Sequence, residues 1–245
     1  MILEVKELKK YFPIERGFLK PAGGFVKALD GVSFSLEEGK ILGIVGESGC
    51  GKSTLAKLIL KLSEPTSGEI NFSPPIQRLR QDVGIVFQEP LLSLDPGMRI
   101  KDIVSEPLLA QRLGCGEERV AGLLGMVGLK GIILTRLPSQ LSGGQRQRVC
   151  IARSLATMPK LLILDEPLSS LDVITQKQIL ELLVTLQNNL KMTYIFISHN
   201  IAVVKRIASQ IIVMLEGRIV EQGDTQEIFT RPQSSYTKKL LEAAR

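Results

Sequence analysis

The stretch "KILGIVGESGCGKSTLAKLILKL", residues 40–62, decides the fold. It begins with a continuous apolar run at 40–46, which is typical of a strand buried on both faces. It ends with residues 52–62, where apolar side chains recur at helical spacing. A glycine-rich segment joins the two. We therefore predict a strand, a loop and a helix, the unit from which α/β proteins with a parallel sheet are built.

The glycine-rich segment fits the phosphate-binding pattern G-x-x-x-x-G-K-[ST], in the strand-to-helix context that this pattern requires. Glycines let the backbone curl so that its N–H groups face phosphates, and the helix N-terminus adds partial positive charge. Lys52 is expected to grip the β- and γ-phosphates, and the Ser53 hydroxyl to bind Mg²⁺. The predicted ATP-binding residues are Gly46, Glu47, Ser48, Gly49, Cys50, Gly51, Lys52, Ser53 and Thr54. The helix N-terminus also favours a thiolate, so we expect Cys50 to be reactive.

Three further apolar runs, at 83–88, 161–165 and 193–198, predict more buried strands of the same sheet. Residues 175–190 have the apolar spacing of a helix that follows the second of these runs. Strands that alternate with helices predict an α/β protein with a mostly parallel sheet.

Antiparallel β-structure is predicted at both ends of the chain. Residues 210–223 have the pattern of a hairpin that turns at Glu216 and Gly217, and the segment 2–36 is also rich in strand patterns. We therefore expect an N-terminal antiparallel β region beside the parallel sheet.

Residues 99–156 contain helical patterns and no strand pattern. The sequence thus predicts one domain over 1–245, in which a helical subdomain at 89–156 is inserted between strands. The α/β nucleotide-binding core is expected to consist of residues 1–88 and 157–245.

Bulk composition limits the possible functions. The net charge is +6 and the pI is near 9.3, but Trp is absent and aromatic residues make up only 4%, so stacking platforms for bases are not expected. The three cysteines are widely spaced and without a CxxC pair, which argues against a disulfide framework or a zinc site. The start "MILEVKELKK" is unlike a signal peptide, and no apolar run approaches the ~20 residues of a membrane helix.

Two adjacent carboxylates end the run "LLILD" and open the next turn. Asp165 is placed to hold hydrated Mg²⁺ at the carboxyl edge of the sheet, where ligands collect. Glu166 is the expected general base, which orients and deprotonates an attacking water. The alternative is a solvated acidic turn.

A second phosphate cradle is predicted at "LSGGQRQR", residues 141–148, where a Ser-Gly-Gly turn opens a basic helix. With this motif the chain resembles, over essentially its whole length, the nucleotide-binding subunits of ATP-binding cassette (ABC) transporters, whose signature is LSGGQ. The resemblance implies an ABC-type P-loop core and two subunits paired head to tail, with ATP on one phosphate loop covered by the signature of the other. The residues that it assigns to the partner's ATP are Ser142, Gly143, Gly144 and Gln145.

The resemblance also assigns roles outside these loops. Asp172 in "SSLD" would lie at the dimer interface, and Gln88 in "VFQEP" would touch Mg²⁺ and sense the membrane subunit. An aromatic residue near the N-terminus usually stacks on adenine; strand alternation favours Phe12 over Tyr11, although a core position is open to both.

His199 in "FISHN" is the only histidine of the chain. By itself, a histidine behind an apolar run is usually a core residue. Its position after the strand that follows Glu166 matches the switch histidine of the family, which would contact the γ-phosphate and hold the catalytic water.

Stretches outside the motifs resemble the ATPase subunits of peptide and nickel importers: "YFPIERGF", "FQEPLLSLDPGMRIKDIVSEPL" and "PQSSYTKKLLEAAR". The resemblance implies an ATPase at the cytoplasmic face of the membrane, which energises import of di- or oligopeptides or of nickel or metal chelates. Its expected partners are a second cassette (identical or paralogous), permease subunits and, indirectly, an extracytoplasmic binding protein, with no nucleic acid.

Two alternatives stay open. A soluble ABC ATPase acting on nucleic acid or ribosomes usually has a long coiled coil or two cassettes in one chain. A small-molecule kinase would leave LSGGQ without a purpose.

Overall fold

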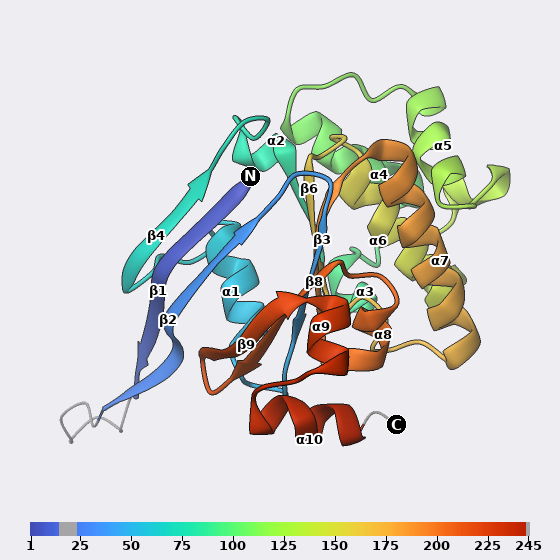
Figure 1. Ribbon diagram of the computed structural model, residues 1–245. Coiled ribbons are helices and arrows are strands. Elements are labelled where there is room, and N and C mark those ends of the chain that lie inside the picture. The colour runs from blue at the N-terminus through green and yellow to red at the C-terminus, as the bar shows by residue number, and fades with distance from the viewer. Residues whose placement is uncertain (15–23, 244–245) are drawn as a thin grey trace. The chain divides into compact units, whose positions relative to one another are not determined.

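Figure 1 shows the computed structural model, which describes residues 1–14 and 24–243. These residues form two compact units. The first unit comprises the described residues of 1–74 and 196–245, and the second comprises 75–195. The predicted subfamily stretch "YFPIERGF" runs beyond Ile14, and the C-terminal stretch runs beyond Ala243; those parts lie outside the described residues.

The first unit contains an antiparallel sheet with the strand order β2-β1-β4. Its strands are β1 (Leu3–Pro13), β2 (Phe25–Leu36) and β4 (Ser67–Phe72). Leu3 pairs with both Leu36 of β2 and Phe72 of β4, so that β1 is the central strand. The β-rich N-terminal region was predicted, but β4 was not. In "SGEINF" no side chain is fully buried, so the strand lacks the apolar run that would have revealed it.

The same unit contains β3 (Ile41–Val45), which pairs in parallel with β8 (Gln210–Leu215), and β8 turns into the antiparallel β9 (Arg218–Asp224). All five residues of β3 are buried, as predicted for a strand covered on both faces. The predicted hairpin is confirmed, since Glu216 and Gly217 form its turn with positive φ. The helices of this unit are α1 (Lys52–Ile59), α8 (Ile201–Lys205), α9 (Thr225–Thr230) and α10 (Ser235–Ala243).

Helix α1 is shorter than the predicted 52–62 because Lys61 adopts a left-handed conformation with φ of 53°. The Lys61 N–H donates to the Leu58 carbonyl, and the Leu62 N–H donates to the Lys57 carbonyl. This is the hydrogen-bond pattern of a Schellman C-cap, which satisfies the last carbonyls and ends the helix. Leu62, which the apolar spacing had included, is 48% exposed.

The second unit contains β5 (Val83–Val86), paired in parallel with β6 (Leu161–Asp165). Strand β7 (Thr193–Ser198) begins in this unit and ends in the first. The prediction of β5 as 83–88 was too long, because Phe87 and Gln88 are exposed and leave the strand. The parallel pairs and the antiparallel sheet together confirm the predicted α/β class.

Helices form most of the second unit, and no strand lies in its described residues between 89 and 156. Helix α6 packs against α3, α4, α5 and α7, so it is the centre of this helical layer (Figure 1). The unit extends beyond the helical subdomain predicted at 89–156, which stays a prediction. Its helices are α2 (Leu79–Asp82), α3 (Pro90–Ser93), α4 (Ile100–Ala110), α5 (Glu117–Met126), η1 (Gly131–Thr135), η2 (Pro138–Gln140), α6 (Gly143–Leu155) and α7 (Val173–Leu190). Among the described residues of the chain, no helix is long and apolar enough to cross a bilayer.

Adjacent leucines of α4 allow a matched test of the helical layer. Leu108 is fully buried, whereas Leu109 is 60% exposed. Leu108→Ala should lower the free energy of unfolding by about 2–5 kcal/mol, since it leaves a cavity. Leu109→Ala should change it by less than about 0.5 kcal/mol. Urea denaturation of both variants measures this difference, and equal losses would contradict the packing of α4.

Candidate nucleotide-binding and catalytic site

The predicted phosphate loop lies between β3 and α1, and its glycines are required by close backbone approaches. Gly46 has φ of 157°, and a Cβ there would lie 2.3 Å from the Met214 carbonyl oxygen. Gly51 has φ of 105°, and its Cβ would lie 2.2 Å from the Ala28 carbonyl oxygen. Both contacts are far below any normal Cβ distance, so a side chain at either position would displace the backbone.

Lys52 is buried at 4% exposure, and its ammonium contacts the backbone of the loop. It donates hydrogen bonds of 2.8 Å to the carbonyl oxygens of Gly46 and of Glu47. These acceptors carry no net charge, and a buried cation is costly without an opposite charge. The loop therefore suits an anion. Glu47, Ser48 and Gly49 form an exposed rim, while Ser53 and Thr54 lie half-buried in the first turn of α1.

The surroundings of Cys50 do not favour the reactive thiolate that the sequence predicted. It is 5% exposed, and burial raises the pKa of its thiol, an effect that outweighs the nearby Lys52 ammonium. The sequence argument used the helix N-terminus alone and omitted desolvation, which disfavours the charged form.

The two candidate adenine-stacking residues lie side by side on β1 in different surroundings. The Tyr11 hydroxyl donates to the Asp30 carboxylate, and the Lys27 ammonium lies 5.4 Å from the centre of the Tyr11 ring. Hydrogen bonds from Tyr11 and then Arg218 hold the pKa of Asp30 far below its usual range. Phe12 is 43% exposed, which agrees with the preference for Phe12 over Tyr11. That preference stays a prediction.

His199 follows β7 and is exposed, so the reading as a core residue is wrong. Asn200, directly after His199, is the N-cap of α8. Its side-chain oxygen accepts from the N–H groups of Ala202 (3.0 Å) and Val203 (3.3 Å). An amide oxygen caps a helix about as well as a carboxylate, so these bonds stabilise the turn after His199.

In the second unit, Asp165 ends β6 and Glu166 follows it, with exposures of only 6% and 9%. Glu166 has φ of 47°, a left-handed conformation that is uncommon outside glycine and costs free energy. The Ser169 hydroxyl and N–H both donate to the Glu166 carbonyl oxygen and close this turn. The Gln88 amide nitrogen lies 3.5 Å from a Glu166 carboxylate oxygen. Strain and buried charge are more typical of a functional site than of a solvated turn.

The predicted signature opens helix α6 through a capping box. The Ser142 hydroxyl accepts from the Gln145 N–H at 3.2 Å, and the Gln145 side-chain oxygen accepts from the Ser142 N–H at 3.0 Å. This reciprocal pair fixes the turn and the helix start. A Cβ on Gly144 would lie 2.7 Å from the Thr175 methyl carbon, so the signature packs tightly against α7.

Asp172 is the N-cap of α7 and is bonded to the same threonine. Its carboxylate accepts from the Thr175 hydroxyl at 2.7 Å and from the Thr175 N–H at 3.0 Å. These bonds, the hydroxyl first, lower the pKa of Asp172. Sequence reasoning missed Thr175, which joins the predicted signature to the predicted interface residue. The sequence did contain a signal for this contact: Thr175 is the third residue of a helix whose N-cap is an aspartate, and the N–H of this position commonly bonds to the cap.

A family model described as ABC transporter matches residues 29–169. The chain belongs to the ABC transporter family. It is similar to the dipeptide transport ATP-binding protein DppF of Haemophilus influenzae, at 46% identity over 99% of this chain and 77% of that protein. The oligopeptide transport ATP-binding protein OppD of Mycobacterium bovis is 45% identical over 99% of this chain, which spans only 42% of OppD.

The fold of this ABC ATPase is also found in solved cassettes. A dimeric structure of the ATP-binding cassette MJ0796, in a post-hydrolysis state with ADP and Pi, matches with a TM-score of 0.77 and 29% identity. The match covers 91% of this chain and 99% of that one. The predicted family, ATP binding and ATPase activity are thus confirmed.

The side chains predicted to hold Mg²⁺ in this ABC ATPase are chemically suited to it. Ser53, Gln88 and Asp165 offer a hydroxyl, an amide oxygen and a carboxylate, the hard oxygen ligands that Mg²⁺ prefers. The donor set therefore fits Mg²⁺.

The raised pKa of Cys50 predicts how its alkylation depends on pH. Only the thiolate reacts with iodoacetamide, so labelling near pH 7 should be slow and should accelerate as the pH rises toward the raised pKa. Peptide mass spectrometry at several pH values measures the rate. Fast labelling of Cys50 at pH 7 in the folded protein would contradict the burial of this thiol.

The contact between Gly144 and Thr175 predicts a rescue. Gly144→Ala should lower the free energy of unfolding by about 1–3 kcal/mol, because the bound Thr175 cannot move its methyl group aside. Thr175→Ser removes this methyl and keeps the hydroxyl, so the double variant should recover most of the loss. Urea denaturation of both single variants and the double variant tests this. No recovery in the double variant would exclude the steric explanation.

Proposed function

We propose that this ABC ATPase energises a membrane importer of dipeptides or oligopeptides. The observation that carries the proposal is the 46% identity to DppF over 99% of the chain, which extends well beyond the nucleotide-binding motifs. DppF and OppD are named for dipeptide and oligopeptide transport, so these names favour peptides over nickel or metal chelates.

The phosphate loop and Lys52 bind the triphosphate in this proposal. Lys52 supplies a buried positive charge, and the loop N–H groups and the α1 N-terminus supply hydrogen bonds. Ser53, Gln88 and Asp165 would hold Mg²⁺, which would neutralise part of the phosphate charge.

Glu166 is the general base of the proposed hydrolysis. It accepts a proton from the attacking water, and the Gln88 amide nitrogen helps to fix the orientation of its carboxylate. Its left-handed backbone places the residue in a tight turn directly after the end of β6. His199 is exposed and donates toward the γ-phosphate, where charge grows in the transition state.

A second cassette, identical or paralogous, completes the site. Ser142 and Asp172 are exposed, and Val173 and Ile174 beside them are 80% and 73% exposed. Large apolar side chains at such exposure, next to a capped phosphate-binding turn, suit an interface. Permease subunits at the cytoplasmic face of the membrane, fed by an extracytoplasmic binding protein, are the further partners.

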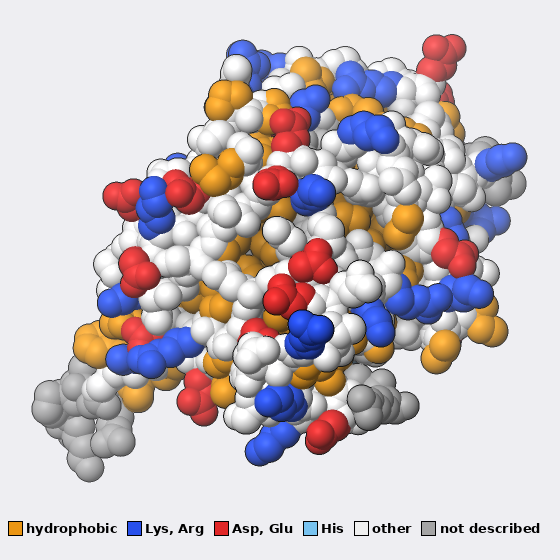
Figure 2. All heavy atoms as spheres, viewed as in Figure 1, with side chains coloured by type: hydrophobic (Ala, Val, Ile, Leu, Met, Phe, Trp, Pro, Cys, Tyr) orange, Lys and Arg blue, Asp and Glu red, His pale blue; other side chains and the backbone are white. Residues whose placement is uncertain are grey.

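The face of the molecule shown in Figure 2 gives no reason to prefer nucleic acid as a partner. On the face shown in Figure 2, the described Lys and Arg side chains are interspersed with Asp and Glu. Binding to a polyanion is favoured by a basic patch or stripe. The net charge of +6 is therefore compatible with an ordinary solvated surface.

Glu166→Gln tests the proposal. It should bind ATP with nearly wild-type affinity, because Lys52 and the loop remain, yet hydrolyse it at least about 10²-fold more slowly, since the base is lost. Fluorescent-nucleotide titration and phosphate release on the assembled complex measure these two quantities. Lys52→Ala is the matched contrast, because it should weaken binding itself.

The importer is tested in membrane vesicles that carry the complex. Wild type should take up a labelled dipeptide when MgATP is supplied on the ATPase side, and Glu166→Gln should not. Uptake that continues with the variant would refute the assigned base. Uptake of nickel and not of peptides by the wild type would refute the assigned cargo.

A further inference from the structure

The C-terminal stretch "PQSSYTKKLLEAAR" resembles the peptide and nickel importer ATPases, but none of its residues belongs to the nucleotide site described above. In the structure its tyrosine contacts the phosphate loop, although 189 positions separate the two residues: the Glu47 N–H donates to the Tyr236 hydroxyl at 3.2 Å. We propose that Tyr236 is a positioning residue for the phosphate loop, through which helix α10 takes part in nucleotide binding. The inference rests on the proposed use of this loop for ATP.

The bond holds one particular peptide group. The peptide that joins Gly46 to Glu47 has its carbonyl oxygen bonded to the Lys52 ammonium at 2.8 Å and its N–H bonded to Tyr236. Both the carbonyl and the N–H of this peptide are therefore fixed. Lys52, the proposed phosphate-binding lysine, holds the carbonyl, and Tyr236 of α10 holds the N–H. Without the hydroxyl, the peptide can rotate, and the position of Lys52 loosens with it.

Tyr236 is itself held in place. On β9, the Glu221 carboxylate accepts from the N–H groups of Gln233 (2.7 Å) and Ser234 (3.0 Å), just before α10 begins. The Ser234 hydroxyl accepts from the Tyr236 N–H at 3.2 Å. The start of α10 is thus bonded to the sheet of its own unit, so the hydroxyl faces the loop from a fixed support.

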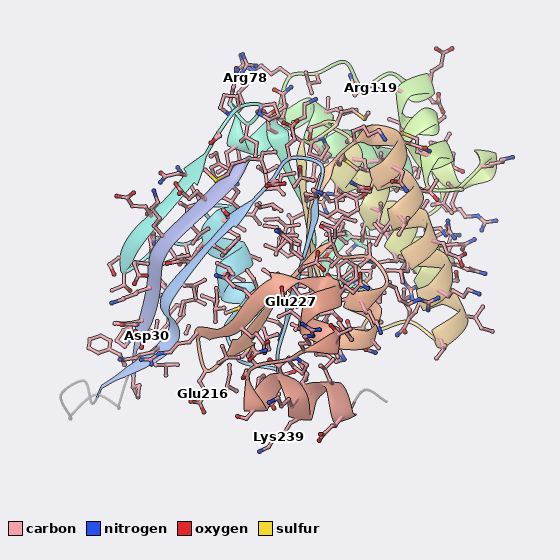
Figure 3. All side chains as sticks on the ribbon, viewed as in Figure 1. Asp30, Arg78, Arg119, Glu216, Glu227 and Lys239 are labelled. Carbon is pink, nitrogen blue, oxygen red and sulfur yellow. The ribbon has the colours of Figure 1, made fainter. Side chains whose placement is uncertain are left out.

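Helix α10 is anchored within its own unit. The helix packs against α8 and β9, with Thr237 fully buried, while Lys239 points outward into solvent (Figure 3). Burial raises the pKa of Tyr236, and this effect outweighs the hydrogen bond from the Glu47 N–H, which by itself lowers the pKa. The hydroxyl therefore stays neutral at physiological pH.

Tyr236→Phe removes the hydroxyl and keeps the ring. We expect ATP affinity to fall by about 3- to 10-fold, the usual effect of losing one hydrogen bond. The melting temperature should change little, because α10 keeps its other contacts. Tyr194→Phe is the matched control: this buried hydroxyl donates to the Leu183 carbonyl at 3.2 Å, so its loss should lower stability and leave ATP affinity unchanged.

Cys50 gives a second readout that needs no ATP. A loosened loop should expose the buried thiol, so maleimide labelling of Cys50 should be several-fold faster in Tyr236→Phe than in wild type. Cys150, which is buried in α6 and has its pKa raised to about 12 by burial, should label equally slowly in both.

Unchanged ATP affinity together with unchanged Cys50 labelling in Tyr236→Phe would overturn the inference. A different result separates the two proposals. If Tyr236→Phe labels faster at Cys50 but the wild type does not bind ATP, Tyr236 still positions the loop, and the proposed function is refuted instead.

Discussion

The close contact of backbone with backbone around the phosphate loop is the constraint on which the nucleotide site depends. Gly46 lies against the Met214 carbonyl of β8, and Gly51 against the Ala28 carbonyl of β2. The Gly217 N–H donates to the Cys50 carbonyl at 3.1 Å. Strands from both ends of the chain thus enclose the loop, and its N–H groups are arranged before a phosphate binds. Such preorganisation reduces the cost of ordering on binding.

The second unit concentrates strain and buried charge in a few residues. Glu166 combines a left-handed backbone with a carboxylate that is only 9% exposed, and Asp165 lies directly before it. The surrounding structure must stabilise this arrangement by several other contacts. Thr175 has a related structural role, since its methyl group supports Gly144 while its hydroxyl and N–H bind Asp172. A small shift of α7 would therefore move both turns together.

Much of the fold and of the candidate site was predictable because the relevant signals are local in sequence. The buried strands around 40–46 and 161–165 are continuous apolar runs, and the phosphate loop and LSGGQ are short glycine motifs with a fixed order. Strand β4 was missed because it carries no such run. The end of α1 was missed because a lysine, and not a glycine, takes the left-handed position at Lys61.

The sequence by itself determined the α/β class, the positions of the phosphate loop and the signature, and the family, since each depends on neighbouring residues or on motif order. Only the tertiary structure decided how residues far apart act on one another. Burial raises the pKa of Cys50, although its place before a helix suggested a lowered one. His199 is exposed and therefore not a core residue. The Tyr236 hydroxyl accepts a hydrogen bond from the Glu47 N–H. Desolvation and long-range hydrogen bonds depend on which surfaces meet in three dimensions, and no local pattern encodes them.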